Sequence, residues 1–209
     1  FGTRAPFIAA ACLSLLNWLY GFFILPESLK PENRRKFDIK RANPFGAFVQ
    51  AKKNKSIRML LIVMFFLYLA GQVMPAIWPF YTKYTYNWSD KEIGYSLAFV
   101  GVMVAIVQGG LIKWSQKKFG PVRSTYVGLL FYIAGLGLFA FASQSWMMYV
   151  FTFIYCLGGI APPSLQGIIS GRIPPNEQGE LQGMMTAMMS LSTILSPLIM
   201  TNLFYFFTK

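Results

Sequence analysis

Hydrophobic residues in this chain gather in runs of about twenty, separated by polar or glycine- and proline-containing segments. About twenty apolar residues are what a helix needs to cross the hydrocarbon core of a bilayer. The pattern therefore predicts an all-α polytopic membrane protein with six transmembrane helices. The predicted spans are residues 6–25, 57–81, 93–112, 126–142, 146–169 and 176–207.

One polar segment, residues 26–56, is much longer than the others and strongly basic. Loops rich in Lys and Arg stay on the cytoplasmic side of a membrane, so this segment fixes the orientation of every span. The same rule places the loops 113–124 and 171–179 on the cytoplasmic side and the tip at residues 82–91 outside. Within the long segment, residues 44–53 are expected to form a short helix on the membrane surface.

The net charge of +12 would indicate a nucleic-acid partner in a soluble protein. Here the basic segment lies between apolar runs, and basic loops that face anionic lipid explain the charge. Composition supports the membrane class, since 55% of the residues are hydrophobic, 12% are charged and the mean hydropathy is +0.47. We therefore expect a lipid bilayer, and no nucleic acid, as a partner.

Ionisable side chains avoid the middle of every predicted span, and the chain contains no histidine. Such groups at membrane depth are the usual sign of a proton relay, an ion site or catalysis. Cys12 and Cys156 lie within apolar runs and suggest neither a metal cluster nor a disulfide framework. The sequence predicts no enzyme, no catalytic residue and no metal site.

Prolines and small residues predict how the spans bend and pack. Pro75 and Pro79 remove backbone donors from the second span and predict a bend there, and Pro162 interrupts the fifth. Asn176 is placed to cap the sixth span. Small residues three and four apart permit close helix contact. They form one stripe in the third span (Gly94, Ala98, Gly101, Ala105) and another in the sixth (Gly183, Thr186, Ser190, Thr193, Pro197).

Uncharged polar side chains remain as candidates for a binding site. They either hydrogen-bond neighbouring helices, at roughly 0.6 kcal/mol per contact, or line a cavity for an amphipathic substrate. Gln72 lies one turn before Pro75, and Gln166 lies one turn after Pro162, so we expect both amides at similar depth on one bound molecule. The candidate substrate-binding residues are Gln72, Trp78, Gln108, Gln166, Thr186 and Ser190.

Three stretches carry a family resemblance. The run GGIAPPSLQGIISGRIPPNEQGELQGMMTAMMSLSTILSPL from Gly158 resembles the tenth and eleventh helices of the tetracycline-efflux (TCR/Tet) branch of the major facilitator superfamily. RAPFIAAACLSLLNWLYGFFILPESL resembles the sixth helix of that branch, and WSDKEIGYSLAFVGVMVAIVQGGL its eighth. The resemblance implies a twelve-helix fold of which this chain, expected to be a fragment, holds helices six to eleven.

The resemblance also implies a domain organisation. Residues 1–25 would be the last helix of the N-terminal half, residues 26–56 the cytoplasmic linker between the halves, and residues 57–209 the C-terminal half with five helices present. The N-terminal half of the same protein would then be a partner of this chain.

A drug:proton antiporter of the bacterial inner membrane is the function that the resemblance implies. It would export amphipathic, tetracycline-like drugs by alternating access, with the proton gradient as the energy source and no cofactor. Its partners would be a small amphipathic substrate and the bilayer. The alternatives are a metabolite importer or facilitator of the same fold, or a membrane scaffold or enzyme.

Three positions depart from the pattern of the tetracycline pumps. Tyr132 falls where those pumps carry a membrane-embedded Asp in the ninth helix, and Asn87 falls where they carry a His before the eighth. Residues 110–124 occupy the place of the basic cytoplasmic turn motif, where Gly120 matches its glycine but the acid is missing. The branch therefore follows from the sequence more directly than the substrate does.

Overall fold

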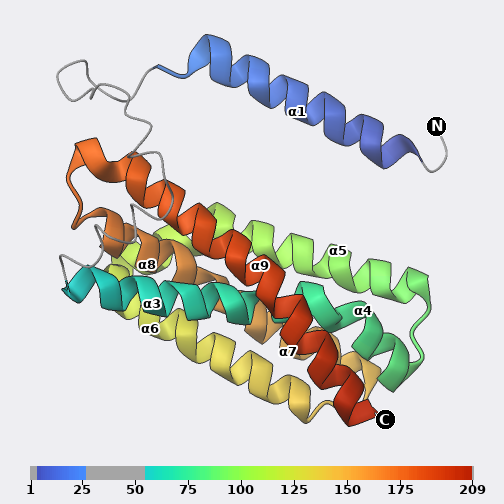
Figure 1. Ribbon diagram of the computed structural model, residues 1–209. Coiled ribbons are helices and arrows are strands. Elements are labelled where there is room, and N and C mark those ends of the chain that lie inside the picture. The colour runs from blue at the N-terminus through green and yellow to red at the C-terminus, as the bar shows by residue number, and fades with distance from the viewer. Residues whose placement is uncertain (1–3, 27–54, 209) are drawn as a thin grey trace. The chain divides into compact units, whose positions relative to one another are not determined.

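The computed structural model describes residues 4–26 and 55–208, and its regular secondary structure over these residues is helical (Figure 1). The chain divides into two units, Phe1–Phe37 and Asp38–Lys209. Helix α1 (Ala5–Ile24) belongs to the first unit and confirms the first predicted span. It starts at a proline-containing turn and ends at Leu25, whose extended backbone is the conformation favoured before a proline. The linker at 26–56 and the surface helix at 44–53 lie almost wholly outside the described residues.

The second unit is a bundle of long helices, several of which are interrupted. Its elements are α3 (Lys55–Gly71), α4 (Val73–Tyr86), α5 (Asp90–Ile106), the π-helical turn η3 (Val107–Leu111), α6 (Ile112–Ala140), α7 (Ser145–Leu157), the 3-10 turns η4 (Gly158–Ile160) and η5 (Pro175–Glu177), α8 (Ala161–Ser170) and α9 (Gln178–Thr208).

The helices of this unit run between two ends (Figure 1). One end, which we call the basic end, gathers the start of α3, the turn within α6, the end of α8 and the start of α9. The other, which we call the far end, gathers the end of α4, the start of α5 and the α6–α7 connection. The cations of the basic end are Arg58, Lys113, Lys117, Lys118, Arg123 and Arg172.

Five helical stretches among the described residues are long and apolar enough to cross a membrane. One of them, Asp90–Ala140, has 51 residues, about 75 Å of helix at 1.5 Å per residue, which is too long for a single crossing of about 30 Å. It contains two of the predicted spans, because the backbone leaves the helical region at Gly120 (φ 76°, ψ 165°). The predicted all-α, multi-span fold is therefore confirmed.

The connection between those two spans differs from the prediction. A loop was expected over residues 113–124, but the chain is helical on both sides of Gly120. Glycine adopts a positive φ without the steric penalty of a Cβ, and Pro121 can open the next helix because its missing N–H is not needed there. The Ser115 and Ser124 hydroxyls then hydrogen-bond at 2.8 Å across the turn. Gly120 alone therefore makes the turn that was expected to need a loop of twelve residues.

The breaks in the second and fifth spans confirm the prediction made from Pro75 and Pro162, whereas Pro79 lies inside the continuous helix α4. The second span is interrupted at Gln72, three residues before Pro75, and resumes as α4. The fifth is interrupted by η4, directly before α8 with Pro162 in its first turn. Near the far end, Ser89 and Glu92 form a reciprocal capping box that starts α5.

The cap predicted at Asn176 is wrong. No side-chain cap bond is formed at η5, and α9 starts at Gln178 among the described residues. The Gln178 amide instead donates to the Ser170 and Ile173 carbonyls, each at 2.9 Å, and accepts from the Ser170 hydroxyl at 2.7 Å. These bonds satisfy carbonyls at and just after the end of α8, so Gln178 ties the connection to that helix.

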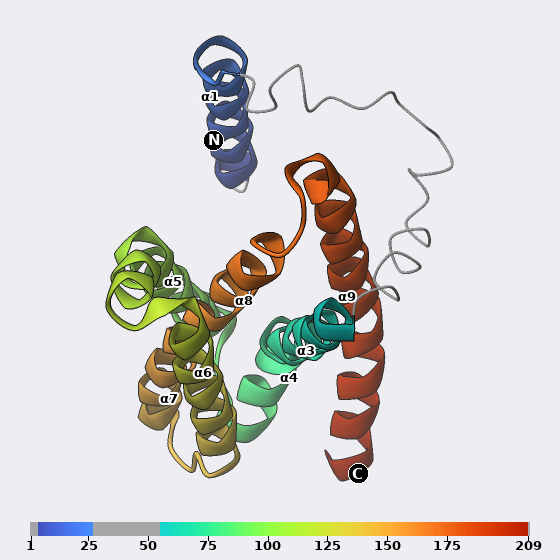
Figure 2. The same cartoon turned by 90° about the vertical axis from the view of Figure 1, so that its left-hand side faces the viewer.

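Two groups of helices make up the unit, as Figure 2 shows: α3 and α4 lie beside α9, while α5, α6 and α7 lie together, and α8 contacts both α3 and α6. The closest approaches between helices occur at glycines of α6 and η4, where α6 contacts α7, α8 and η4. A Cβ on Gly128 or Gly135 would lie 2.6 Å from the backbone of Ala161 or Tyr155. A Cβ on Gly158 would lie 2.6 Å from the Tyr132 ring.

The stripe of small residues predicted in the third span is exposed within the described residues, and Gly94 and Gly101 have no atom within 4 Å of a built Cβ. On α9, the stripe from Gly183 to Thr193 is also exposed. The opposite face of α9 packs into the bundle through Leu181, Met184, Met185, Met188, Ser192 and Ser196. Small-residue stripes permit close helix contact, and these two stripes are not used for contact within the described residues.

Candidate substrate cavity

A partly open cavity of about 490 Å³ lies where the two helix groups meet, and we call it the polar cavity. One helix group contributes α3, the other contributes α5 to α7 with η3 and η4, and α8 completes the wall. Its volume lies within the range of about 300–1,000 Å³ that small-molecule sites occupy. The lining residues are Tyr68, Val104, Val107, Gln108, Ile112, Tyr132, Cys156, Gly159, Pro162, Pro163 and Gln166.

Irregular helical turns form part of this wall. The π-helical turn η3 carries Val107 and Gln108, and such turns occur frequently at functional sites because the extra residue redirects side chains. On the other side, Gly159 lies in η4 and lines the cavity. Pro163, four residues later, has no N–H to offer the Gly159 carbonyl. The backbone is therefore irregular on two sides of one cavity, as is tolerated at membrane depth where helices border protein or a wet space.

The polar atoms of this wall have spare hydrogen-bonding capacity. In the described part of the chain, the Gln108 amide and the Tyr68 and Tyr132 hydroxyls form no hydrogen bond. The Gln166 amide donates to the Gln182 side chain of α9 at 3.2 Å. Because an amide offers two donors and an acceptor, this pair leaves further bonds available. The cavity can therefore bind a molecule that has both apolar surface and hydrogen-bonding groups.

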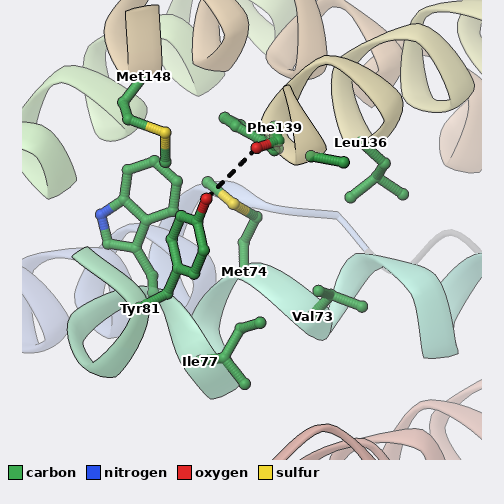
Figure 3. Close-up of a pocket in the computed structure, with 9 residues that line it drawn as sticks. Val73, Met74, Ile77, Tyr81, Leu136, Phe139 and Met148 are labelled. Carbon is green, nitrogen blue, oxygen red and sulfur yellow. Dashed lines mark hydrogen bonds between the residues drawn. The ribbon is translucent and has the colours of Figure 1, made fainter. Parts of the chain in front are cut away.

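A second cavity, of about 210 Å³, lies between α4, α6 and α7 and is shown in Figure 3. We call it the apolar pocket. Its two polar wall atoms are already paired: the Trp78 indole donates to Ser96 Oγ at 2.9 Å, and the Tyr81 hydroxyl points to the Phe139 carbonyl at 3.4 Å. The remaining wall residues are Val73, Met74, Ile77, Leu136, Phe139, Ala140 and Met148.

The six residues predicted to bind substrate separate into four places. Gln108 and Gln166 lie together on the wall of the polar cavity. Trp78, only 3% exposed, lies in the apolar pocket. Gln72 is half-buried in the break between α3 and α4, and it lines neither cavity.

The other two candidates lie on the exposed stripe of α9. Thr186 donates its hydroxyl to the Gln182 carbonyl, one turn earlier, at 2.9 Å, and Ser190 is exposed one turn later. Neither of them lines the two cavities described above. The structure therefore brings Gln108 and Gln166 together and separates the other four candidates from them.

Several wall residues were not predicted from the sequence. Tyr68, Tyr132 and Cys156 lie in apolar runs, where a tyrosine or cysteine is normally a packing residue. Their positions beside the helix breaks could have indicated a place in the wall. Tyr68 precedes Gln72 by one turn, and Cys156 precedes the Gly158–Gly159 pair. Gln182, which bonds Gln166 without lining the cavity, was also not predicted.

Hydrogen bonds connect the helix breaks near the cavity. Pro75 cannot donate to the Gly71 carbonyl, and the Tyr155 hydroxyl donates to that carbonyl at 3.5 Å. The Ser196 hydroxyl of α9 donates to the Leu69 carbonyl at 3.4 Å. Both bonds are long, so each is weak. They nevertheless hold the break in the second span against α7 and α9.

Residues 1–206 match the Major Facilitator Superfamily. The chain belongs to this superfamily. It is 36% identical over 201 residues to the class C tetracycline resistance protein of Escherichia coli, a match covering 96% of this chain and 50% of that protein. It is 32% identical to the class G tetracycline resistance protein of Vibrio anguillarum, with 96% and 51% covered.

A vertebrate protein is also similar. Hippocampus abundant transcript-like protein 1 of Bos taurus is 25% identical over 213 residues, covering 99% of this chain and 42% of that protein. The chain thus spans about half the length of the curated relatives it matches. The resemblance to the tetracycline-efflux branch is confirmed by these similarities.

The structure shows where the residues compared with the tetracycline pumps lie, namely Tyr132, Asn87 and the motif glycine Gly120. Tyr132 lines the polar cavity, so the position is part of the candidate site although its carboxylate is replaced by a phenol. Asn87 ends α4 in the left-handed region (φ 53°), where Asn is among the best-tolerated residues. Gly120 makes the turn between the two spans. Asn87 and Gly120 therefore have clear backbone roles, and Tyr132 faces the cavity.

Proposed function

We propose that this chain is part of a drug:proton antiporter that exports amphipathic, tetracycline-like molecules across a bacterial inner membrane by alternating access. The basic end faces the cytoplasm, because Lys- and Arg-rich connections resist translocation. The polar cavity forms this chain's side of the substrate site. A second set of helices, equivalent to the rest of the relatives' length, closes the site from the opposite side.

One observation carries the proposal. Three unpaired polar groups, from Gln108, Tyr68 and Tyr132, share a cavity wall with apolar side chains in a chain that is similar over 96% of its length to a tetracycline resistance protein. A flat amphipathic drug offers hydroxyl, carbonyl and amide groups to such a wall and ring faces to its apolar part. The exposed stripes of α5 and α9 give the second set of helices a surface to pack on.

A second candidate is import or facilitated movement of a metabolite on the same fold. Tyr132 favours it, since a phenol stands where the tetracycline pumps carry a carboxylate. Under this alternative the substrate still uses the polar cavity, but transport is inward or needs no proton gradient.

Transport in everted inner-membrane vesicles containing the protein separates the two candidates. We expect tetracycline to accumulate when respiration acidifies the vesicle interior and to leak out after an uncoupler collapses the gradient. Equilibration without accumulation, unaffected by the uncoupler, would indicate facilitation. Uptake only into right-side-out vesicles would indicate import, and either result would overturn the proposal.

The same vesicles test the site. Loss of one neutral hydrogen bond costs about 0.5–1.5 kcal/mol, so Gln108→Ala and Gln166→Ala should each raise the KM for drug about two- to twelvefold at unchanged abundance. Gln144→Ala is the matched control, because Gln144 is an exposed glutamine at the far end. If both cavity variants behave like this control, the amides do not contact substrate.

A further inference from the structure

One continuous helix runs through α5, η3 and the start of α6. It extends beyond the third predicted span, residues 93–112. From Asp90 to Phe119 this helix has a length of about 45 Å at 1.5 Å per residue, whereas the hydrocarbon core is about 30 Å thick. With Ile93 at one membrane boundary, a span of about twenty residues ends near Ile112. The two turns after Ile112 therefore lie at the level of the lipid headgroups.

These two turns and the start of the next helix present an exposed cationic surface. We define the headgroup surface as Lys113, Trp114, Lys117, Lys118, Phe119 and Arg123, all of which are exposed. No Asp or Glu occurs between Glu92 and Glu177 in the sequence. Within the described residues, none of the four cations forms an ion pair. Lys113 and Lys117 lie four apart on one helix face, where like charges repel unless an anion lies near them.

Aromatic side chains accompany these cations. The Lys118 ammonium lies 5.0 Å from the Trp114 ring centre and 5.5 Å from that of Phe119. Exposed Trp beside Lys is typical of the boundary between acyl chains and headgroups, where the ring contacts the apolar side and the ammonium contacts phosphate. The surface therefore has the two contacts that a phospholipid needs.

Buried hydrogen bonds fix this segment on the bundle. Ser115 and Ser124, both buried, bond to each other at 2.8 Å across the Gly120 turn. The Gln116 amide donates to the buried Ser164 hydroxyl of α8 at 3.1 Å. The inward face of the turns is thus attached to α8, and the cationic face is held in a fixed position toward the bilayer.

We propose that the headgroup surface is a binding site for anionic phospholipid, with the lipid phosphate between the lysines and the acyl chains against Trp114. The site is independent of what the protein transports. Near a membrane surface each cation contributes about fivefold to binding of anionic lipid, about 1 kcal/mol.

Spin-labelled lipids in vesicles containing the protein test the proposal. We expect the protein to associate with labelled phosphatidylglycerol in preference to labelled phosphatidylcholine at low salt. The double variant Lys117→Gln/Lys118→Gln should reduce this preference by roughly an order of magnitude or more, as follows from two such contributions. High salt should reduce it in the unchanged protein.

The double variant Lys83→Gln/Lys91→Gln is the matched control, because it removes the same charge at the far end, where Lys83 pairs with Asp90 at 3.3 Å. It should keep the preference. Equal loss in both variants would mean general attraction by net charge and would overturn the site. Displacement of the lipid by millimolar inorganic phosphate would mean a free-anion site and would also overturn it.

Discussion

The polar cavity and the apolar pocket share two helices, α6 and α7, but differ in the state of their polar atoms. α6 supplies Tyr132 to the first and Leu136 and Phe139 to the second. In the apolar pocket both polar wall groups, from Trp78 and Tyr81, already have partners within the protein. In the polar cavity Tyr68, Tyr132 and Gln108 have none among the described residues.

This difference separates a binding site from a packing defect. A buried polar group normally finds a partner, because leaving it unpaired costs about 1–3 kcal/mol. Gln108 is exposed and Tyr68 and Tyr132 are half-buried, so these three groups are open to water or to a bound molecule. The apolar pocket has no such need, and its residues serve mainly to join α4, α6 and α7. Variants that disturb helix packing test this contrast most broadly, and variants that remove a single hydroxyl test it most narrowly.

Gly135→Ala should damage both cavities, because a Cβ there lies 2.6 Å from the Tyr155 backbone and forces α6 away from α7. Overpacking of this kind costs about 1–3 kcal/mol or more. We expect lower abundance and a lower midpoint of thermal unfolding. Gly137→Ala, two residues along the same helix with no atom within 4 Å of its built Cβ, is the control. Equal behaviour of the two variants would contradict the described helix contact.

Trp78→Ala should affect stability and leave substrate affinity unchanged. Truncation of a buried Trp in a packed site costs about 3–5 kcal/mol, and the Ser96 hydroxyl also loses a partner. Unfolding of the purified protein measures the loss, with the exposed Trp146→Ala as the control. If Trp78→Ala instead weakens drug binding and spares stability, the apolar pocket is itself a substrate site.

The sequence predicted most of the fold but only part of the site. The apolar runs gave the spans, and Pro75 and Pro162 marked the two interrupted helices, because a missing backbone donor acts locally. The polar cavity depends on which helix faces turn toward each other. Gln108 was predicted because an amide stands out in an apolar run, whereas Tyr68 and Tyr132 look the same in sequence as Tyr155, which packs in the core.

The Gly120 turn and the small stripes show the same limit. The composition of residues 113–124 indicates a loop, yet one positive-φ glycine suffices. The stripe on α5 looks like a contact face in sequence, but the glycines with the closest contacts in the described residues are Gly128 and Gly135 on α6 and Gly158 in η4. Local chemistry determines where helices start and break, whereas the orientation of a face depends on partners distant in the chain.

Tyr132→Phe and Tyr81→Phe form a matched pair, since each removes one hydroxyl from one cavity. Loss of an unpaired hydroxyl in the polar cavity should weaken drug affinity by about two- to twelvefold, corresponding to about 0.5–1.5 kcal/mol. Tyr81→Phe should leave affinity unchanged, because its hydroxyl bonds the Phe139 carbonyl. Binding to purified protein measures both, and weaker binding in Tyr81→Phe alone would reverse the assignment of the two cavities.

Tyr155→Phe should have the smallest effect. It removes a hydrogen bond of 3.5 Å to the Gly71 carbonyl, which is long enough to contribute less than about 1 kcal/mol. We expect a small decrease in the unfolding midpoint and normal drug affinity. A loss of affinity comparable to that of Tyr132→Phe would mean that the link between the helix breaks shapes the site.

The two native cysteines allow the central claim, that substrate occupies the polar cavity, to be tested directly. Cys156 lies in the wall of that cavity, and Cys12 lies on α1. Cys156 is only 5% exposed, so in a Cys12→Ser background methyl methanethiosulfonate should modify it slowly, and saturating tetracycline should slow that modification further.

The comparison site is a thiol in the apolar pocket, introduced by Met148→Cys in a background that lacks both native cysteines. The measurement is the ratio of modification rates with and without tetracycline at each position. We predict protection of Cys156 and no protection at position 148. Protection at position 148 alone, or equal rates with and without drug at Cys156, would contradict the claim.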